Sequence, residues 1–258
     1  MKLIDTHSHM YSDKFNEDLE LAVKRAKEVH VSKIYMPNID LESIEPMKKL
    51  ASDFPGFFVP MMGLHPCSVG ADVEEVLSKI KSELDLGGYV AVGEIGIDLY
   101  WDKTFFKEQE HAFRTQISWA KEKQLPIVIH ARDSFDEIFS IVDEMNDDRL
   151  TGIFHCFTGD IDQAHKIINY GGFKMGVGGV LTFKNSGLDA VVKEIDLKHF
   201  VLETDSPYLS PMPHRGKRNE SAYVSLVAQK LADIHELPIE RVAEITTNNA
   251  LEVYKEIN

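Results

Sequence analysis

The sequence has little cysteine and no long hydrophobic run among its 258 residues. Two cysteines, Cys67 and Cys156, are too few for a disulfide-built scaffold, and they indicate a reducing compartment. The longest nearly apolar run, residues 57–64, is too short to span a bilayer. Near the amino terminus, Asp5 interrupts the apolar residues before an export signal can form. We therefore expect a cytoplasmic protein with no membrane partner.

Positive charge is also scarce. The chain has 28 Lys and Arg against 42 Asp and Glu, a net charge of −14, which argues against a broad basic face that grips long duplexes. Hydrophobic residues make up 43% of the chain, which excludes a disordered protein and is enough for a large core. Whatever the protein binds must therefore be bound locally, and no obligate protein partner is indicated.

Short apolar segments alternate with longer stretches of helical periodicity along the chain. Eight segments are predicted strands: residues 3–6, 33–37, 57–62, 89–93, 126–129, 152–154, 173–177 and 200–202. Helical spacing covers residues 19–29, 73–84, 105–123 and 134–145, and two closing helices are predicted at 223–234 and 239–257. One unit per about 32 residues favours an α/β fold, a (β/α)8 barrel in one domain spanning 1–258, over an open doubly wound sheet.

Side chains that bind metals recur at the carboxyl ends of these predicted strands, where the chemistry of a (β/α)8 barrel is located. They are His7 and His9 after the first segment, His65 after the third, Glu94 after the fourth, His130 after the fifth, His155 after the sixth and Asp205 after the eighth. Such convergence is hard to explain as core packing, because burying polar groups without partners is costly.

This set of donors predicts a centre with two divalent ions. His7 and His9 are two residues apart, so on an extended segment both side chains project to the same side. Four histidines and two carboxylates exceed the ligands of one tetrahedral ion, and Glu94, from the middle of the strand order, is the expected bridge. Asp205 is the expected acceptor of a proton from the attacking water. Zinc, manganese, magnesium and iron suit these donors.

The ordered motifs resemble those of the TatD-type metal-dependent deoxyribonucleases, which belong to the amidohydrolase-like barrels. The matching stretches are D-T-H-S-H at 5–9, G-L-H-P at 63–66, G-E-I-G-I-D at 93–98, I-H-A-R at 129–132, H-C-F-T-G at 155–159 and L-E-T-D-S-P-Y-L at 202–209. The resemblance implies a distorted TIM barrel that hydrolyses DNA phosphodiester bonds with metal ions, often as an exonuclease from a 3′ end.

The resemblance also implies roles for individual residues. One ion would be held by His7, His9, Glu94 and Asp205, and the other by Glu94, His130 and His155. His65 would lie beside the scissile phosphate as a hydrogen-bond or proton donor. Some relatives have a further histidine where this chain has Cys67, which leaves substrate handling open at that position.

Other charged residues near the predicted site have two interpretations each. Glu203 lies two residues before Asp205, so alternation predicts that it is buried, either as a salt-bridged core carboxylate or as a group that orients ligands or water. Arg215, Lys217 and Arg218 crowd into four residues after the last predicted strand. They are either a solvated loop or contacts for the phosphates that flank the cleaved bond.

Three residues after the fourth and fifth predicted strands are further candidates. Arg132 is expected either to contact phosphate or to form a salt bridge with Asp133 or another nearby acid. Tyr100 and Trp101 either offer a stacking surface for a base or pack as core aromatics beneath a helix.

Together these patterns favour a two-metal hydrolase of DNA that acts on single strands or frayed ends, because one short basic loop supplies few phosphate contacts. A second candidate is a barrel hydrolase of an amide, a lactone or a phosphotriester. Many of those bridge their metals with a modified lysine on the fourth strand, where this chain has Glu94. A non-catalytic metal-binding scaffold is a third candidate, which the full set of expected ligands disfavours.

Overall fold

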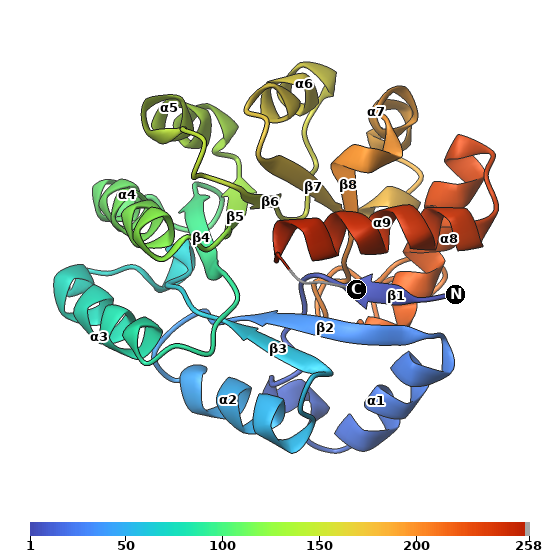
Figure 1. Ribbon diagram of the computed structural model, residues 1–258, viewed down its shortest axis with the longest axis horizontal. Coiled ribbons are helices and arrows are strands. Elements are labelled where there is room, and N and C mark those ends of the chain that lie inside the picture. The colour runs from blue at the N-terminus through green and yellow to red at the C-terminus, as the bar shows by residue number, and fades with distance from the viewer. Residues whose placement is uncertain (256–258) are drawn as a thin grey trace.

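Parallel strands alternate with helices along residues 1–255, which are the residues that the computed structural model describes (Figure 1). The strands are β1 (Leu3–Asp5), β2 (Val31–Pro37), β3 (Phe58–Met61), β4 (Val92–Asp98), β5 (Ile127–Arg132), β6 (Gly152–Phe154), β7 (Phe173–Val177) and β8 (Phe200–Leu202). The helices are α1 (Leu19–Glu28), α2 (Ile44–Asp53), α3 (Val73–Asp85), α4 (Phe106–Lys123), α5 (Phe135–Met145), α6 (Ile161–Asn169), α7 (Leu188–Glu194), α8 (Val224–His235) and α9 (Ile239–Val253).

The strands close into a barrel that has two weak seams. Strands β1 to β3 form one parallel sheet and β4 to β8 form another. A single bridge between Met62 and Val92 joins β3 to β4, and a bridge between Ser8 and Ser206 joins the ends of β1 and β8. The N–H of Thr6 also donates to the carbonyl oxygen of Leu202 at 3.0 Å. The fold is therefore the predicted (β/α)8 barrel, distorted at these seams.

The barrel interior holds an apolar layer that α9 covers. Inward side chains of the strands form one buried cluster with residues of α9: Ile4, Tyr35, Met61, Ala91, Val128, Ile153 and Val201, with Ala250, Leu251, Val253 and Tyr254 from α9 and the residue that follows it. The rings of Tyr35 and Tyr254 stack at 3.9 Å between centroids. Figure 1 shows α9 lying across this end of the barrel. The predicted closing helix thus seals the interior.

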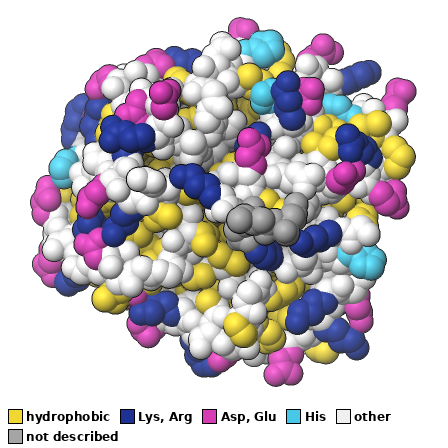
Figure 2. Space-filling view, viewed as in Figure 1, with side chains coloured by type: hydrophobic (Ala, Val, Ile, Leu, Met, Phe, Trp, Pro, Cys, Tyr) yellow, Lys and Arg dark blue, Asp and Glu magenta, His cyan; other side chains and the backbone are white. Residues whose placement is uncertain are grey.

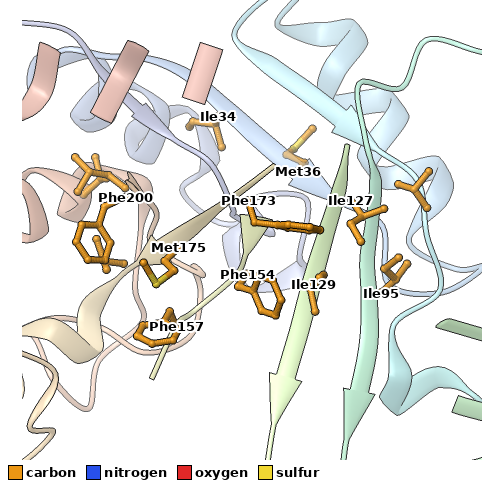
Figure 3. Packing of buried hydrophobic residues seen from close by; sticks show 14 of the residues in the cluster. Ile34, Met36, Ile95, Ile127, Ile129, Phe154, Phe157, Phe173, Met175 and Phe200 are labelled. Atoms are coloured by element: carbon orange, nitrogen blue, oxygen red, sulfur yellow. The ribbon is translucent and has the colours of Figure 1, made fainter. Parts of the chain in front are cut away.

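The other face of each strand packs against the helices. In β5, Ile127 and Ile129 point outward while Val128 points inward, as the period of two along a strand requires. Figure 3 shows Ile127 and Ile129 with Ile95 and Phe154 in this outer layer. Full burial of such a side chain stabilises the fold by about 1.5–3 kcal/mol.

The predicted ranges of two strands were wrong. Strand β4 begins at Val92 and continues to Asp98, whereas residues 89–93 were predicted, and β5 continues to Arg132 rather than ending at residue 129. The strands were predicted to end too early because the polar residues Glu94 and His130 interrupt the apolar runs in the sequence. In the barrel these two side chains face each other at 2.8 Å, which compensates their burial. The last helix is described to Val253, and residues 256 and 257 of its predicted range lie outside the described residues.

Within residues 1–255, no helix combines the length and the apolar character that crossing a bilayer requires. On the face seen in Figure 2, acidic and basic side chains are interspersed. This face therefore offers no continuous basic surface for duplex nucleic acid.

Candidate metal centre

The period of the strands delivers polar side chains just above the apolar layer of the barrel. Val128, Ile153 and Val201 belong to the inner layer, and His130, His155 and Glu203 follow them by two residues. Beyond β1 and β8 the two backbones stay hydrogen-bonded to each other. The N–H of residue 205 donates to the carbonyl oxygen of residue 7 at 2.9 Å, and the N–H of residue 9 donates to that of residue 206 at 2.7 Å. This pairing brings the first and last motifs of the sequence together.

The first group of donors surrounds one oxygen of Glu94. Oε2 of Glu94 lies 3.1 Å from Nε2 of His7 and 3.7 Å from Nε2 of His9, and the two nitrogens are 3.3 Å apart. Oδ1 of Asp205 lies 3.5 Å from Nε2 of His9 and 3.9 Å from Nε2 of His7. The structure therefore brings together the four side chains that were expected to share one ion.

The second group surrounds the other oxygen of the same carboxylate. Oε1 of Glu94 lies 2.8 Å from Nδ1 of His130, 3.5 Å from Nε2 of His65 and 3.7 Å from Nε2 of His155. Glu94 is buried between the two groups and presents a different oxygen to each. This is the position expected of a bridging carboxylate.

A hydrogen-bond chain sets the proton position on His9. The hydroxyl of Tyr11 donates its proton to the carbonyl oxygen of Pro37 at 2.6 Å, so it accepts from Nδ1 of His9 at 2.9 Å. Nε2 of His9 is then left with a lone pair, and this nitrogen is the one that faces Glu94 and Asp205. A second partner that holds the outer nitrogen is typical of metal-binding histidines.

Carboxylates also lie beside the outer nitrogens of His130 and His155, as a hydrogen-bond partner of His130 and as an ion-pair partner of His155. Nε2 of His130 lies 2.9 Å from Oδ2 of Asp98, and Nδ1 of His155 lies 2.9 Å from Oε1 of Glu203. Glu203 is fully buried, and it also accepts from the N–H of Cys156 at 2.6 Å. Both carboxylates therefore orient a histidine and leave its inner nitrogen directed at Glu94.

His65 has the opposite proton arrangement. The N–H of Cys67 donates to Nδ1 of His65 at 3.0 Å, so the proton of the neutral ring is on Nε2. This nitrogen faces His130 at 3.3 Å and Glu94 at 3.5 Å. Burial lowers the pKa of His65, which favours the neutral ring. His65 therefore offers the centre a hydrogen-bond donor, and the contact that fixes it uses the backbone of Cys67 rather than its thiol.

The donors fit divalent ions in both spacing and charge. Donor atoms that share an ion at about 2.0–2.2 Å are separated by roughly 3.0–3.6 Å, close to the separations between His7, His9 and Glu94. Burial disfavours the charge on Glu94, but the surrounding histidines outweigh it and hold the pKa of this carboxyl well below its ordinary value. Burial likewise opposes a charge on His155, yet Glu203 and Glu94 raise its pKa. The carboxylates thus favour positive charge at the centre. Bound metal cations would supply this charge in place of the protons on the histidines.

Comparison with known proteins identifies the family. A family model described as TatD related DNase matches residues 4–255. The chain belongs to the TatD family. The uncharacterized metal-dependent hydrolase YabD of Bacillus subtilis is 38% identical to it over 254 residues, which cover 98% of this chain and 99% of YabD.

Solved structures agree with this assignment. The crystal structure of the TatD homologue YjjV from Escherichia coli matches with a TM-score of 0.91 and 29% identity, covering 99% of this chain and 98% of YjjV. A TatD family hydrolase from Entamoeba histolytica, at 21% identity, shares the fold with a TM-score of 0.82 and covers 98% of each chain. The protein is therefore a metal-dependent hydrolase of the TatD family.

Arg218, one of the predicted phosphate contacts of this TatD protein, forms an ion pair with Asp18. The guanidinium of Arg218 donates to both carboxylate oxygens of Asp18, at 2.5 and 2.8 Å, and to the carbonyl oxygen of Lys14 at 2.8 Å. Asp18 lies 200 residues earlier in the chain, so no local pattern could have predicted this ion pair. Arg218 therefore ties the loop after β8 to the segment before α1.

The other predicted cations remain at the surface. Arg215 and Lys217 are exposed and have no ion-pair partner among residues 1–255. The guanidinium of Arg215 lies over the ring of Phe183, 4.3 Å from its centroid. Arg132 does not form the alternative salt bridge with Asp133 within the described chain and instead lies over Tyr100, 3.9 Å from the ring centroid.

Tyr11 and Asp98 were missed in the sequence. Asp98 lies four residues after Glu94 in β4, so alternation places both on one side of the strand. Tyr11 lies in the turn in which the N–H of Ser12 donates to the carbonyl oxygen of His9. Asp98 was also part of the G-E-I-G-I-D stretch that matches the TatD pattern. The alternation that predicted the burial of Glu203 would have found Asp98 as a support for His130, whereas no local period predicts the role of Tyr11.

Proposed function

We propose that this TatD-family hydrolase is a two-ion phosphodiesterase that cleaves DNA. The observation that carries the proposal is Glu94, whose two oxygens face two separate groups of histidine nitrogens. One buried carboxylate in this position suits a shared ligand between paired ions better than a ligand of a single ion. We further propose that the enzyme removes nucleotides from the 3′ ends of single-stranded or frayed DNA.

The expected ligands of the first ion are His7, His9, Glu94 and Asp205, and those of the second are Glu94, His130 and His155. When bound, the two ions would acidify water and neutralise the charge that develops on the phosphate. Zinc, magnesium and manganese are the candidates.

Two side chains of the chain itself would move or hold protons. The carboxylate of Asp205 is 15% exposed, whereas that of Glu94 is 3% exposed, so Asp205 is the acid of the first group that solvent reaches. It would accept the proton of the attacking water. His65 carries its proton on the nitrogen that faces the centre, and it would donate a hydrogen bond to a phosphate oxygen or a proton to the leaving oxygen.

The charge distribution supports a substrate with few phosphate contacts. The chain has a net charge of −14, and Arg215 and Lys217 are free cations in the loop that follows Asp205. We propose that these two residues hold phosphates near the cleaved bond, without a membrane or an obligate protein partner. We also propose that the chain acts as one catalytic domain, in the cytoplasm because Cys67 and Cys156 are free thiols.

The test couples metal analysis of the purified protein to a substrate screen. We expect about two ions per chain, and release of nucleotides from a labelled single-stranded DNA that a chelator abolishes. Asp205→Asn and Glu94→Gln should each lower this rate by at least about a hundredfold. Glu144→Gln is the matched control, because Glu144 is exposed and paired only with Arg114 at the surface.

Other substrates separate the competing functions. Duplex DNA, RNA, an amide and a lactone are offered under the same conditions. Hydrolysis of the amide or the lactone without any cleavage of DNA would replace the proposal with the second candidate function. Full nuclease activity of the Asp205→Asn enzyme would reject the assignment of the site.

A further inference from the structure

Two large aromatic side chains stand exposed directly beyond β4. Tyr100 is 53% exposed and Trp101 is 69% exposed. Their rings pack edge to face, with centroids 4.9 Å apart and planes at 87°. The interpretation of this pair as core aromatics is therefore wrong, and their exposed ring surfaces are accessible to a stacking partner.

An unpaired guanidinium lies over the same two rings. The Cζ atom of Arg132 is 3.9 Å from the ring centroid of Tyr100 and 5.3 Å from that of Trp101. Arg132 is exposed, and no carboxylate among residues 1–255 lies within ion-pair distance of it. Its charge is held in place by the aromatic faces and remains available to an anion.

Hollows flank the aromatic pair. One, of about 360 Å³, is lined by Tyr100, Arg132, Asp133, Phe135, Thr158 and Gln163 among others. This volume lies in the range of about 300–1,000 Å³ found for small-molecule sites. Trp101 lines a second hollow, of about 70 Å³, together with Cys67. The aromatic pair therefore forms the wall between two spaces at the end of the barrel that carries the candidate metal centre.

A single buried carboxylate joins this surface to that centre. Oδ1 of Asp98 accepts from the N–H groups of Tyr100 at 3.0 Å and Trp101 at 3.1 Å. Oδ2 of Asp98 lies 2.9 Å from Nε2 of His130, and Asp98 is 1% exposed. Arg132 is aligned with Asp98 between β4 and β5. The backbone of the aromatic pair is thus held in register with a histidine of the proposed ion site.

We infer that Tyr100, Trp101 and Arg132 form a subsite for one nucleotide of single-stranded DNA, in which the base stacks on the aromatic rings and the guanidinium pairs with the adjacent phosphate. The inference rests on the proposed cleavage of DNA. An aromatic face accepts any base, so the subsite recognises a nucleotide without reading sequence. Bases inside a duplex are already stacked on each other, so only an unpaired end can enter.

The kinetic test uses matched oligonucleotides that differ only in their bases. One is a short thymidine oligomer, and the other has abasic sites at its 3′-terminal positions with all phosphates kept. We expect the wild-type enzyme to show a KM about five- to a hundredfold lower for the oligomer with bases. Tyr100→Ala and Trp101→Ala should bring the ratio of the two KM values towards one, whereas Trp101→Phe keeps most of it.

Arg132→Gln provides the complementary variant. It should raise KM for both oligomers by a similar factor and reduce the dependence of KM on salt, because its contact is with phosphate. The inference is overturned if wild-type KM is the same for both oligomers, or if the ratio survives in both alanine variants.

A binding measurement keeps the inference separate from the proposed activity. The chain has two tryptophans, so Trp119→Phe leaves Trp101 as the only one. In this background, combined with Asp205→Asn to block cleavage, the thymidine oligomer should quench the fluorescence of Trp101 and the abasic oligomer should not. Quenching without any cleavage by the wild-type enzyme would reject the proposed function alone. Cleavage of DNA with no quenching would reject the subsite alone.

Discussion

Replacing Gly176 with alanine should disable the centre without touching any proposed ligand. Gly176 lies in β7 directly beneath Glu203, the carboxylate that faces His155. A Cβ atom at residue 176 would come within 2.1 Å of Oε2 and 2.6 Å of Cδ of Glu203. Contacts under 3.0 Å essentially never occur for real Cβ atoms, so the carboxylate has to move by about 0.9 Å.

The burial of Glu203 and its polar contacts oppose this movement. Glu203 is fully buried and is held by the N–H of Cys156 at 2.6 Å, with His155 at 2.9 Å. Displacing it releases His155 from its orientation, and loss of such a supporting contact typically lowers metal affinity or activity by about 10- to 100-fold. The crowding should also lower the free energy of unfolding by about 1–3 kcal/mol.

The assay compares Gly176→Ala with Gly178→Ala. A Cβ atom at residue 178 would lie 3.5 Å or more from Glu203, which is ordinary contact, and the backbone there is extended. We expect Gly178→Ala to keep its metal content and its rate within about twofold. Circular dichroism and urea unfolding show whether each variant is folded. If folded Gly176→Ala binds metal and cleaves substrate like the wild type, the role given to Glu203 is wrong.

Two further predictions concern stability. Leu251→Ala opens a cavity where α9 covers the barrel interior and should lower the free energy of unfolding in urea by about 2–4 kcal/mol. The control is Leu86→Ala, at a side chain that is 75% exposed, which should change this free energy by less than about 0.5 kcal/mol. Equal effects of the two substitutions would contradict the packing described for α9. Asp18→Asn should cost about 1 kcal/mol at pH 7, and the cost should shrink as pH falls below about 4. Hydrogen bonds from Arg218 and then Arg25 hold the pKa of Asp18 well below its ordinary value. The ionised carboxylate therefore stabilises the folded protein fully at any pH above the pKa that Asp18 has in the unfolded chain. This contribution to the free energy of unfolding is lost as the pH falls towards the lower pKa of Asp18 in the folded protein. A cost independent of pH between 7 and 3 would refute this linkage.

Local patterns in the sequence were sufficient for the fold. The alternation of apolar segments predicted the barrel, and the ranges of β6, β7 and β8 agree with the predicted residues. The prediction failed at the ends of β4 and β5, because a charged residue within an apolar run was taken as the end of a strand. Glu94 remains inside β4 because histidines from other strands compensate its charge, and this compensation is a non-local property.

The sequence by itself also placed metal-binding residue types at one end of the barrel, because strand ends and a period of two can be read locally. Only the tertiary structure decided which nitrogen of each ring faces the centre. His9 and His65 are both histidines near strand ends, yet Tyr11 makes one a lone-pair donor and the backbone of Cys67 makes the other a proton donor.

Only the tertiary structure also showed which positively charged side chains form ion pairs and which do not. Arg218 is neutralised by Asp18 from the other end of the chain, while Arg132 is left unpaired over Tyr100. The physical reason is that the pairing of a charge depends on which distant segments meet it in space. Local patterns in the sequence predict the strands and helices of the barrel. The way these elements pack in the folded barrel determines which atoms each polar group contacts.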